Sequence, residues 1–344
     1  AGAAGLVLLA AVGCDGGSGH GQTSQLTFTQ LTILPARADV VTTDGGYVVL
    51  ADFDNDGDLD AASGFASDQD VLLHLQDAAG VWLNSILGTG HGRIQSLAVA
   101  DVDESGQPDV FAATDTGKIV LFLAPSFAGL DGAWDDSVLN NPTPVAFWSD
   151  VKVADLDNQT GEEVIAVSPS SNLIAVWRAE ADVGSAADYH GFVIANLTNE
   201  FDRLELGDID GDNDTDVVAV GPVKVVWLEN PGTADITQAW TVHTVGNRGG
   251  LTRLAVADVD GDGDLDIVAT SRTTGEVILF ENLGDPRSDR WHSYVIADLS
   301  PEEPDALSPG DLDRDGQTDL LVGSDGPEGT IFWLTPYDNV RLSW

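Results

Sequence analysis

The chain has 344 residues, and its 57 Asp and Glu against 14 Lys and Arg give a formal net charge of −43. A surface this negative repels phosphate backbones and anionic lipid headgroups, so we expect no nucleic acid partner. Hydrophobic residues make up 43% of the chain, which is enough for a sizeable core and argues against disorder. A single cysteine excludes intramolecular disulfides and cysteine-rich zinc sites, and the six histidines lack metal-ligand spacing. Any metal is therefore expected to be bound by oxygen.

The first thirteen residues are apolar, rich in small side chains and too short to span a bilayer. Together with Cys14 they end in LLAAVGC, which resembles the end of a bacterial lipoprotein signal, where the cysteine becomes acylated. The resemblance implies a signal-peptide remnant at 1–13, lipidation of Cys14 and a flexible linker at 14–25. The alternative is a buried strand with an inert thiol. We therefore expect an extracytoplasmic protein, anchored by its N-terminal lipid at a bacterial cell surface or outer membrane, or secreted.

Residues 26–344 contain six copies of one acidic nine-residue segment, and such a repeat decides the fold. We call the copies loops one to six: 52–60, 101–109, 155–163, 208–216, 258–266 and 311–319. Their first aspartates are 49, 54, 53, 50 and 53 residues apart, which is the length of one propeller blade.

Each loop follows an alternating stretch such as 96–103, which predicts a strand, and precedes a second strand such as 266–270. A third strand carries an aromatic residue 22 positions after the first aspartate in copies three, five and six, namely Trp177, Phe280 and Trp333. His74 occupies that position in the first copy, so we expect it in the core rather than in catalysis. A fourth strand follows in most copies, as at 240–245.

These units predict one all-β domain, a β-propeller of six four-stranded blades. Because the sixth unit lacks a fourth strand, we expect residues 27–34 to complete it and close the ring. A seven-bladed propeller is the alternative.

The loop pattern D-x-D-x-D-G-x-x-D places oxygen ligands at positions 1, 3, 5 and 9, with a main-chain carbonyl near position 7. Calcium is the expected ion, about one per loop, because it accepts flexible oxygen cages. The predicted ligands are Asp52, Asp54, Asp56 and Asp60; Asp101, Asp103, Ser105 and Asp109; Asp155, Asp157, Gln159 and Glu163; Asp208, Asp210, Asp212 and Asp216; Asp258, Asp260, Asp262 and Asp266; and Asp311, Asp313, Asp315 and Asp319.

Two loops depart from the pattern. Ser105 replaces a carboxylate in loop two, which predicts weaker binding. Loop three is the most degenerate, because Gln159 and Glu163 fill positions 5 and 9 and Gly161 comes one place late. If the segments were merely solvated acidic turns, six copies in register with an apolar residue at position 2 would have no explanation.

The repeats resemble the FG-GAP/VCBS family of calcium-loop propellers, which are akin to the integrin α-subunit head; the resemblance covers residues 47–335. An EF-hand fits less well, because its twelve-residue loop ends in glutamate and lies between helices. The resemblance implies that the calcium loops share one face and that partners bind the opposite face.

Five basic residues are expected near that opposite face: Arg93, Arg203, Arg248, Arg253 and Arg272. Together they would form a seat for an acidic sugar or for a partner's carboxylate. The alternative is that each arginine pairs with a nearby acid.

We therefore favour a non-catalytic calcium-binding surface module that binds protein or glycan in adhesion or envelope assembly. A polysaccharide-processing enzyme of the lyase or dehydratase kind is one alternative, although no catalytic constellation is recognised in the sequence. A structural subunit that self-assembles into an extracellular polymer is the other.

Overall fold

The computed structural model describes residues 7–11, 28–32, 46–65, 69–77, 79–125, 130, 134–180, 183–232, 235–288, 290–325 and 330–336. Its regular structure is β-strand, apart from the short 3₁₀ turns η2 (Pro169–Ser171), η3 (Ala186–Asp188) and η5 (Pro286–Ser288). In these ranges no helix has the length and hydropathy that a membrane crossing requires. The all-β prediction is confirmed.

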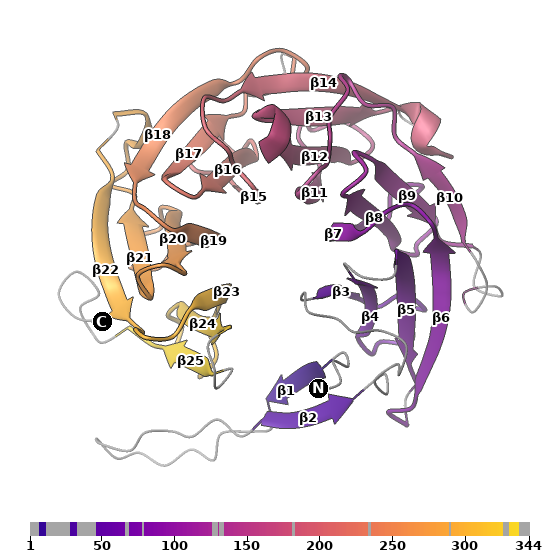
Figure 1. The fold of residues 1–344 in the computed structure, drawn as a ribbon, viewed down its shortest axis with the longest axis horizontal. Coiled ribbons are helices and arrows are strands. Elements are labelled where there is room, and N and C mark those ends of the chain that lie inside the picture. Colours follow the sequence, from indigo (N-terminus) through magenta and orange to yellow (C-terminus); the bar gives the residue numbers. More distant parts are fainter. Residues whose placement is uncertain are drawn as a thin grey trace.

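Six antiparallel sheets stand as blades around a central axis (Figure 1). The first three blades contain β3 (Gly46–Ala51), β4 (Asp60–Phe65), β5 (Asp70–Gln76) and β6 (Trp82–Thr89); β7 (Ile94–Ala100), β8 (Asp109–Thr114), β9 (Ile119–Leu123) and β10 (Asp135–Val138); and β11 (Asp150–Ala154), β12 (Glu163–Ser168), β13 (Leu173–Ala179) and β14 (Tyr189–Asn196).

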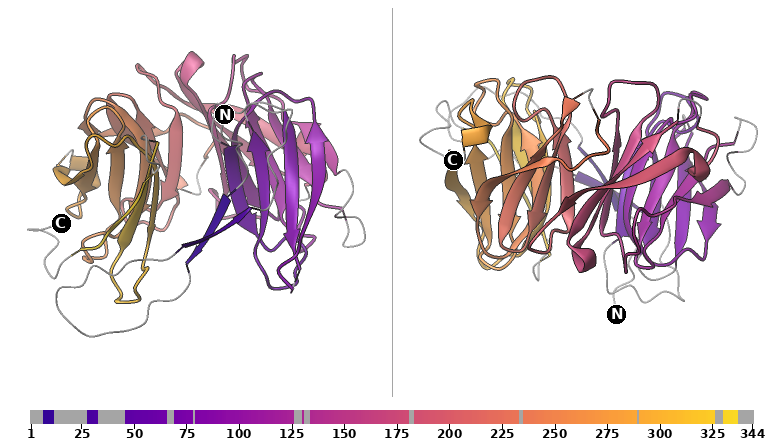
Figure 2. Two further views of the ribbon diagram at one scale, coloured as in Figure 1. Left: turned by 60° about the horizontal axis from the view of Figure 1, so that its bottom comes forward. Right: turned by 90° about the horizontal axis from the view of Figure 1, so that it is seen from above.

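The last three blades contain β15 (Arg203–Gly207), β16 (Asp216–Gly221), β17 (Lys224–Glu229) and β18 (Thr241–Asn247); β19 (Leu251–Ala257), β20 (Asp266–Ser271), β21 (Glu276–Glu281) and β22 (His292–Asp298); and β23 (Pro304–Gly310), β24 (Asp319–Ser324) and β25 (Ile331–Leu334). In each blade the first strand lies nearest the axis and the chain runs outward (Figure 1). Figure 2 shows the same ring of blades from the side. The predicted six-bladed propeller is confirmed.

The hydrophobic core lies between neighbouring blades. Second strands such as β8 and β16 are buried along their whole length, because a blade packs on each of their faces. Phe111 of blade two shares a core cluster with Trp148 and Trp177 of blade three, and the two tryptophan rings meet edge to face at 5.1 Å. The inner strands contact one another in series from β3 to β23.

The expected closure of the ring is wrong. The strand formed within residues 27–34, β2 (Phe28–Thr32), pairs with β1 (Val7–Ala11) in a separate two-stranded sheet, and the described part of blade six has three strands. This pair lies between blades six and one (Figure 1). A strand pattern predicts that a segment is extended but not which edge it joins. β1 falls in the predicted signal remnant, and Cys14 and the linker 14–25 lie outside the described residues.

The inner strand of blade one, which faces blade six, is more exposed than its counterparts in blades two and three. Leu97 and Val151, each four residues before an acidic loop, are buried because the preceding blade covers them. Val48 holds the same repeat position in blade one and is 45% exposed, and Leu50 beside it is 44% exposed. Among the described residues, the inner strand of blade one is therefore less covered on this side than the inner strands of blades two and three.

Candidate metal centres

The six acidic loops join the first and second strands of their blades, so they share one face of the propeller. The aspartate at position 1 organises each turn by accepting backbone N–H groups. In loop five Oδ1 of Asp258 accepts from Gly261 N at 2.8 Å and Oδ2 accepts from Gly263 N at 3.1 Å. In loop one Oδ2 of Asp52 accepts from Gly57 N at 3.0 Å. The carboxylates therefore shape the loop from within.

Two positions of each regular loop have a left-handed backbone. A left-handed backbone was expected at position 6, and Asn213 at position 6 of loop four has φ +69°. Position 4 was missed: Gly261 has φ +75° and Arg314 has φ +63°. The available signal was that position 4 is Gly or Asn in four of the six loops.

The acid at position 9 is buried and ties the loop to its blade. In loop five Oδ2 of Asp266 accepts from Val259 N at 3.0 Å, and Oδ1 accepts from Asn282 N, just after β21, at 2.9 Å. Asp60 makes the same two bonds in loop one, to Phe53 N and Gln76 N. Position 9 thus has a structural role whether or not an ion is bound.

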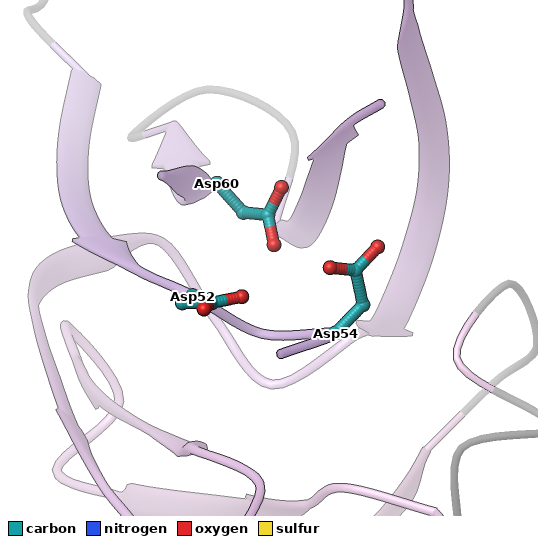
Figure 3. Close-up of side chains that lie close together, drawn as sticks. All are labelled: Asp52, Asp54 and Asp60. Carbon is teal, nitrogen blue, oxygen red and sulfur yellow. The ribbon is translucent and has the colours of Figure 1, made fainter. Parts of the chain in front are cut away.

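Carboxylates from separate loop positions converge. Figure 3 shows Asp52, Asp54 and Asp60 facing one another, and one oxygen from each lies within 4.8 Å of the others. Comparable groups are Asp101, Asp103 and Asp109; Asp155, Asp157 and Glu163; Asp208, Asp210 and Asp216; and Asp258, Asp260 and Asp262. The structure therefore brings together predicted ligands of loops one to five in groups that could hold a metal ion.

The electrostatics of these groups are unfavourable to bare carboxylates. Burial raises the pKa of Asp60 to about 6, of Asp109 to about 7 and of Asp216 to about 8, and neighbouring aspartates add to the effect although backbone N–H groups oppose it. Oδ1 of Asp101 and Oδ1 of Asp319 are buried and have no hydrogen-bond partner. A divalent cation would neutralise the charge and complete these contacts, so the donor set fits a hard ion.

Loop three neutralises its charge differently. Asp157, whose side chain is 7% exposed, pairs with Nη2 of Arg178 on β13 at 2.8 Å. The Gln159 amide donates to the backbone oxygens of Asp157 and Asn158. Glu163 keeps the position-9 bond to Leu156 N at 2.9 Å. A guanidinium is therefore already present at this cluster.

Loop four also has a basic neighbour. Arg287 of η5 in blade five pairs with Asp210, lies 3.8 Å from Asp212 and contacts Glu229 at 2.9 Å. Neither Arg178 nor Arg287 was singled out from the sequence, because nothing in the spacing shows which loop they approach.

The five arginines expected on the opposite face have partners there. Arg93 lies 3.9 Å from the carboxylate of Asp115, and Arg248 lies 3.0 Å from that of Glu276. Arg253 and Arg272 share Asp305 as a partner, at 3.3 Å and 3.7 Å. Arg272 also contacts Glu303 and Asp325, each at 2.8 Å. Nη1 of Arg203 donates to the backbone oxygens of Ser149 and Asp202. The structure thus places an acid or carbonyl beside each one.

His74 is fully buried in blade one. Its Nε2 lies 2.7 Å from Ser63 Oγ, and its Nδ1 lies 2.6 Å from Asn84 Oδ1. Because two side chains already occupy both ring nitrogens, the structure gives His74 the core position expected from the repeat.

Comparison with known proteins places the chain in a family. The FG-GAP-like repeat model matches residues 52–112, 208–269 and 258–322, which is more than half of the chain. The chain therefore belongs to the FG-GAP-like repeat family. No curated protein sequence matches it.

Two solved structures share its fold. A lectin from Agrocybe aegerita, described as recognising non-reducing terminal N-acetylglucosamine, has a TM-score of 0.56 at 14% identity, covering 85% of this chain and 81% of the lectin chain. BBS1N in complex with ARL6DN has a TM-score of 0.53 at 12% identity, covering 92% of this chain and 84% of the BBS1N structure's matched chain. At these identities the similarity shows the fold alone.

Proposed function

We propose that the protein is a non-catalytic binding module whose propeller is stabilised by calcium. The observation that carries the calcium proposal is the convergence of buried carboxylates whose pKa is raised and whose oxygens in part have no hydrogen-bond donor. The proposed sites are loops one, two, four, five and six. Loop three is excepted because Arg178 pairs with Asp157 and Gln159 replaces the carboxylate at position 5. Loop four also has an arginine, Arg287, but keeps a carboxylate at all four positions.

The experiment is metal analysis of the full chain combined with thermal unfolding. We expect about five calcium ions per chain after dialysis against calcium, one for each loop that follows the pattern. Each occupied site at a hundredfold excess over its Kd adds about 2.7 kcal/mol to the free energy of unfolding. Chelation should therefore lower the melting temperature by about 10 °C or more, and magnesium should restore little of it. An unchanged melting temperature after chelation would contradict the proposal.

A role in binding protein or glycan ligands is supported by the family and by the two similar folds, one described with a sugar and one with a protein. We place this role at an outer cell surface, with the N-terminal lipid as the only link to a membrane. Screening the calcium-loaded chain on a glycan array and against surface proteins of its own cell tests it. Depolymerisation of an acidic polysaccharide would favour the enzyme alternative, and concentration-dependent filaments would favour the structural one.

A further inference from the structure

A hollow of about 430 Å³ lies on the face opposite the acidic loops, where blades two, three and four meet. Its walls come from segments that lead into the inner strands β7, β11 and β15 and from the turns between second and third strands, including Pro169 and Pro222. Because the strands are antiparallel, these segments all lie at the end away from the acidic loops. The volume falls in the range of about 300–1,000 Å³ that is usual for ligand pockets.

The polar part of this hollow is rich in hydrogen-bond acceptors. Oδ1 of Asp202 is buried and has no hydrogen-bond partner. The exposed carboxylate of Glu200 lines the same hollow. Ser149 Oγ already donates to Val167 O at 3.2 Å, so its lone pairs can only accept. The lining also holds the donors of the Gln95 amide and the Ser170 hydroxyl, but neither bonds to Oδ1 of Asp202, and a ligand that donates hydrogen bonds would satisfy this oxygen.

The one basic residue in the lining is committed to contacts within the protein. Nη1 of Arg203 donates to the backbone oxygens of Ser149 and Asp202, each at 2.9 Å. Nη2 donates at 3.3 Å to the hydroxyl of Tyr47, which lies on β3 of blade one. The guanidinium also lies 5.8 Å from the centre of the Tyr47 ring. With two carboxylates against one engaged arginine, the hollow disfavours an acidic ligand.

The remaining wall is apolar. Phe147 is half-buried in the hollow, and Pro169 and Pro222 lie in the same lining. A saccharide ring offers both an apolar C–H face for such a wall and several hydroxyl donors for the carboxylates. A lysine side chain could pack its methylene groups on this wall, but it offers one ammonium group to two carboxylates and no ring face to Phe147.

We propose that this hollow is a binding site for a neutral saccharide. The carboxylates of Glu200 and Asp202 accept hydrogen bonds from its hydroxyl groups, and Phe147 packs against its ring. The inference rests on the proposed function as a binding module and gives that module a site and a ligand class.

The test uses the full calcium-loaded chain and saturation-transfer NMR. The neutral probes are N-acetylglucosamine, lactose and maltose, the acidic probe is glucuronic acid, and the ammonium probe is Nα-acetyllysine amide. The strongest neutral binder is then titrated against Glu200→Gln and Phe147→Ala. Glu180→Gln is the matched control, because Glu180 is also an exposed carboxylate but lines a different hollow. That hollow has a volume of about 530 Å³ and is built from residues of blade three, the 155–163 loop and Thr237.

We expect neutral sugars to bind, Glu200→Gln and Phe147→Ala each to raise Kd about tenfold, and Glu180→Gln to leave it unchanged. Melting temperatures in calcium show whether each variant is folded. Glu200 is exposed, so Glu200→Gln is expected to fold like the unaltered chain. No binding of any neutral probe, equal binding by Glu200→Gln, or tighter binding of the acidic or ammonium probe would overturn the inference. Sugar binding that is insensitive to both pocket variants would overturn this site while leaving the proposed binding module intact.

Discussion

Loop five and loop three occupy the same place in their blades but stabilise their carboxylates in different ways. Both keep the position-9 acid that ties the loop to the blade, Asp266 in one and Glu163 in the other. Loop five then gathers Asp258, Asp260 and Asp262 into a group fit for a cation. Loop three instead pairs a buried aspartate with Arg178.

The comparison separates two tasks that the repeated motif combines. The tether at position 9 belongs to the fold, because it bonds backbone groups in both loops. The neutralisation of charge at positions 1, 3 and 5 is exchangeable, because a guanidinium can take the place of a metal ion. Mutations at the two kinds of position should therefore differ in whether calcium changes their effect.

The largest expected effect comes from disabling loop five. Asp258→Asn with Asp260→Asn should remove one calcium ion and lower the free energy of unfolding in calcium by about 3 kcal/mol. In chelator the same change should cost about 1 kcal/mol or less, because the relief of two repelling charges offsets the loss of one backbone hydrogen bond to Asp258. The measurement is urea unfolding with and without calcium, together with metal analysis.

The matched control for that change is Asp155→Asn in loop three. It should leave the number of bound ions unchanged and should have the same effect on unfolding in calcium as in chelator. Loss of an ion from the loop-three variant would show that Arg178 does not replace the cation.

The second effect is steric and compares glycines of the two loops. Gly161 has φ +98°, and an added Cβ would lie 2.9 Å from the Cβ of Ala179. Gly263 has φ +96°, but an added Cβ there meets nothing within 4 Å. We expect Gly161→Ala to cost about 2–3 kcal/mol and Gly263→Ala about 1 kcal/mol, since the second adds only left-handed strain. Equal losses in urea unfolding would mean that loop three relaxes around the new methyl group.

The third effect tests Arg178 directly. Arg178→Met should leave the nearly buried Asp157 without its guanidinium and cost about 1–2 kcal/mol, because Arg178 itself is half exposed. The loss should be the same in calcium and in chelator. Arg93→Met, at a 60% exposed side chain 3.9 Å from its acid, should change the free energy of unfolding by less than about 0.5 kcal/mol. A loss that calcium cancels would mean that loop three binds an ion once the arginine is removed.

The repeat made much of this fold predictable. Six segments in register fix the blade number, the strands around each loop and the convergence of their acids, because each relation recurs within one unit. Relations between units were not predictable. The guanidinium of Arg287 reaches loop four from the next blade, and the strand near residue 30 chooses β1 as its neighbour. Neither contact recurs from repeat to repeat, so the spacing of the sequence does not predict it. The hollow beside Asp202 was predicted only in part: Arg203 was expected on this face, but the sequence did not show that segments of three blades meet there.

The smallest effect concerns the core position behind the loops, where blades three and five have Trp177 and Phe280 and blade one has His74. Burial lowers the pKa of His74 below its ordinary value of 6.5, although the hydrogen bond with Asn84 opposes this. The unfolded chain therefore binds a proton more readily than the folded chain does. Stability from the neutral ring is complete above about pH 6.5 and falls as the pH drops below that value, by at most about 1.4 kcal/mol per pH unit. His74→Phe should remove this part of the acid sensitivity. The measurement is urea unfolding in chelator, where the variant should show a smaller difference in midpoint between pH 7.5 and pH 5. The buried Ser63 hydroxyl loses its partner at both pH values, so that loss does not affect the difference. Parallel pH dependence in the two proteins would mean that the buried ring takes up its proton without unfolding blade one.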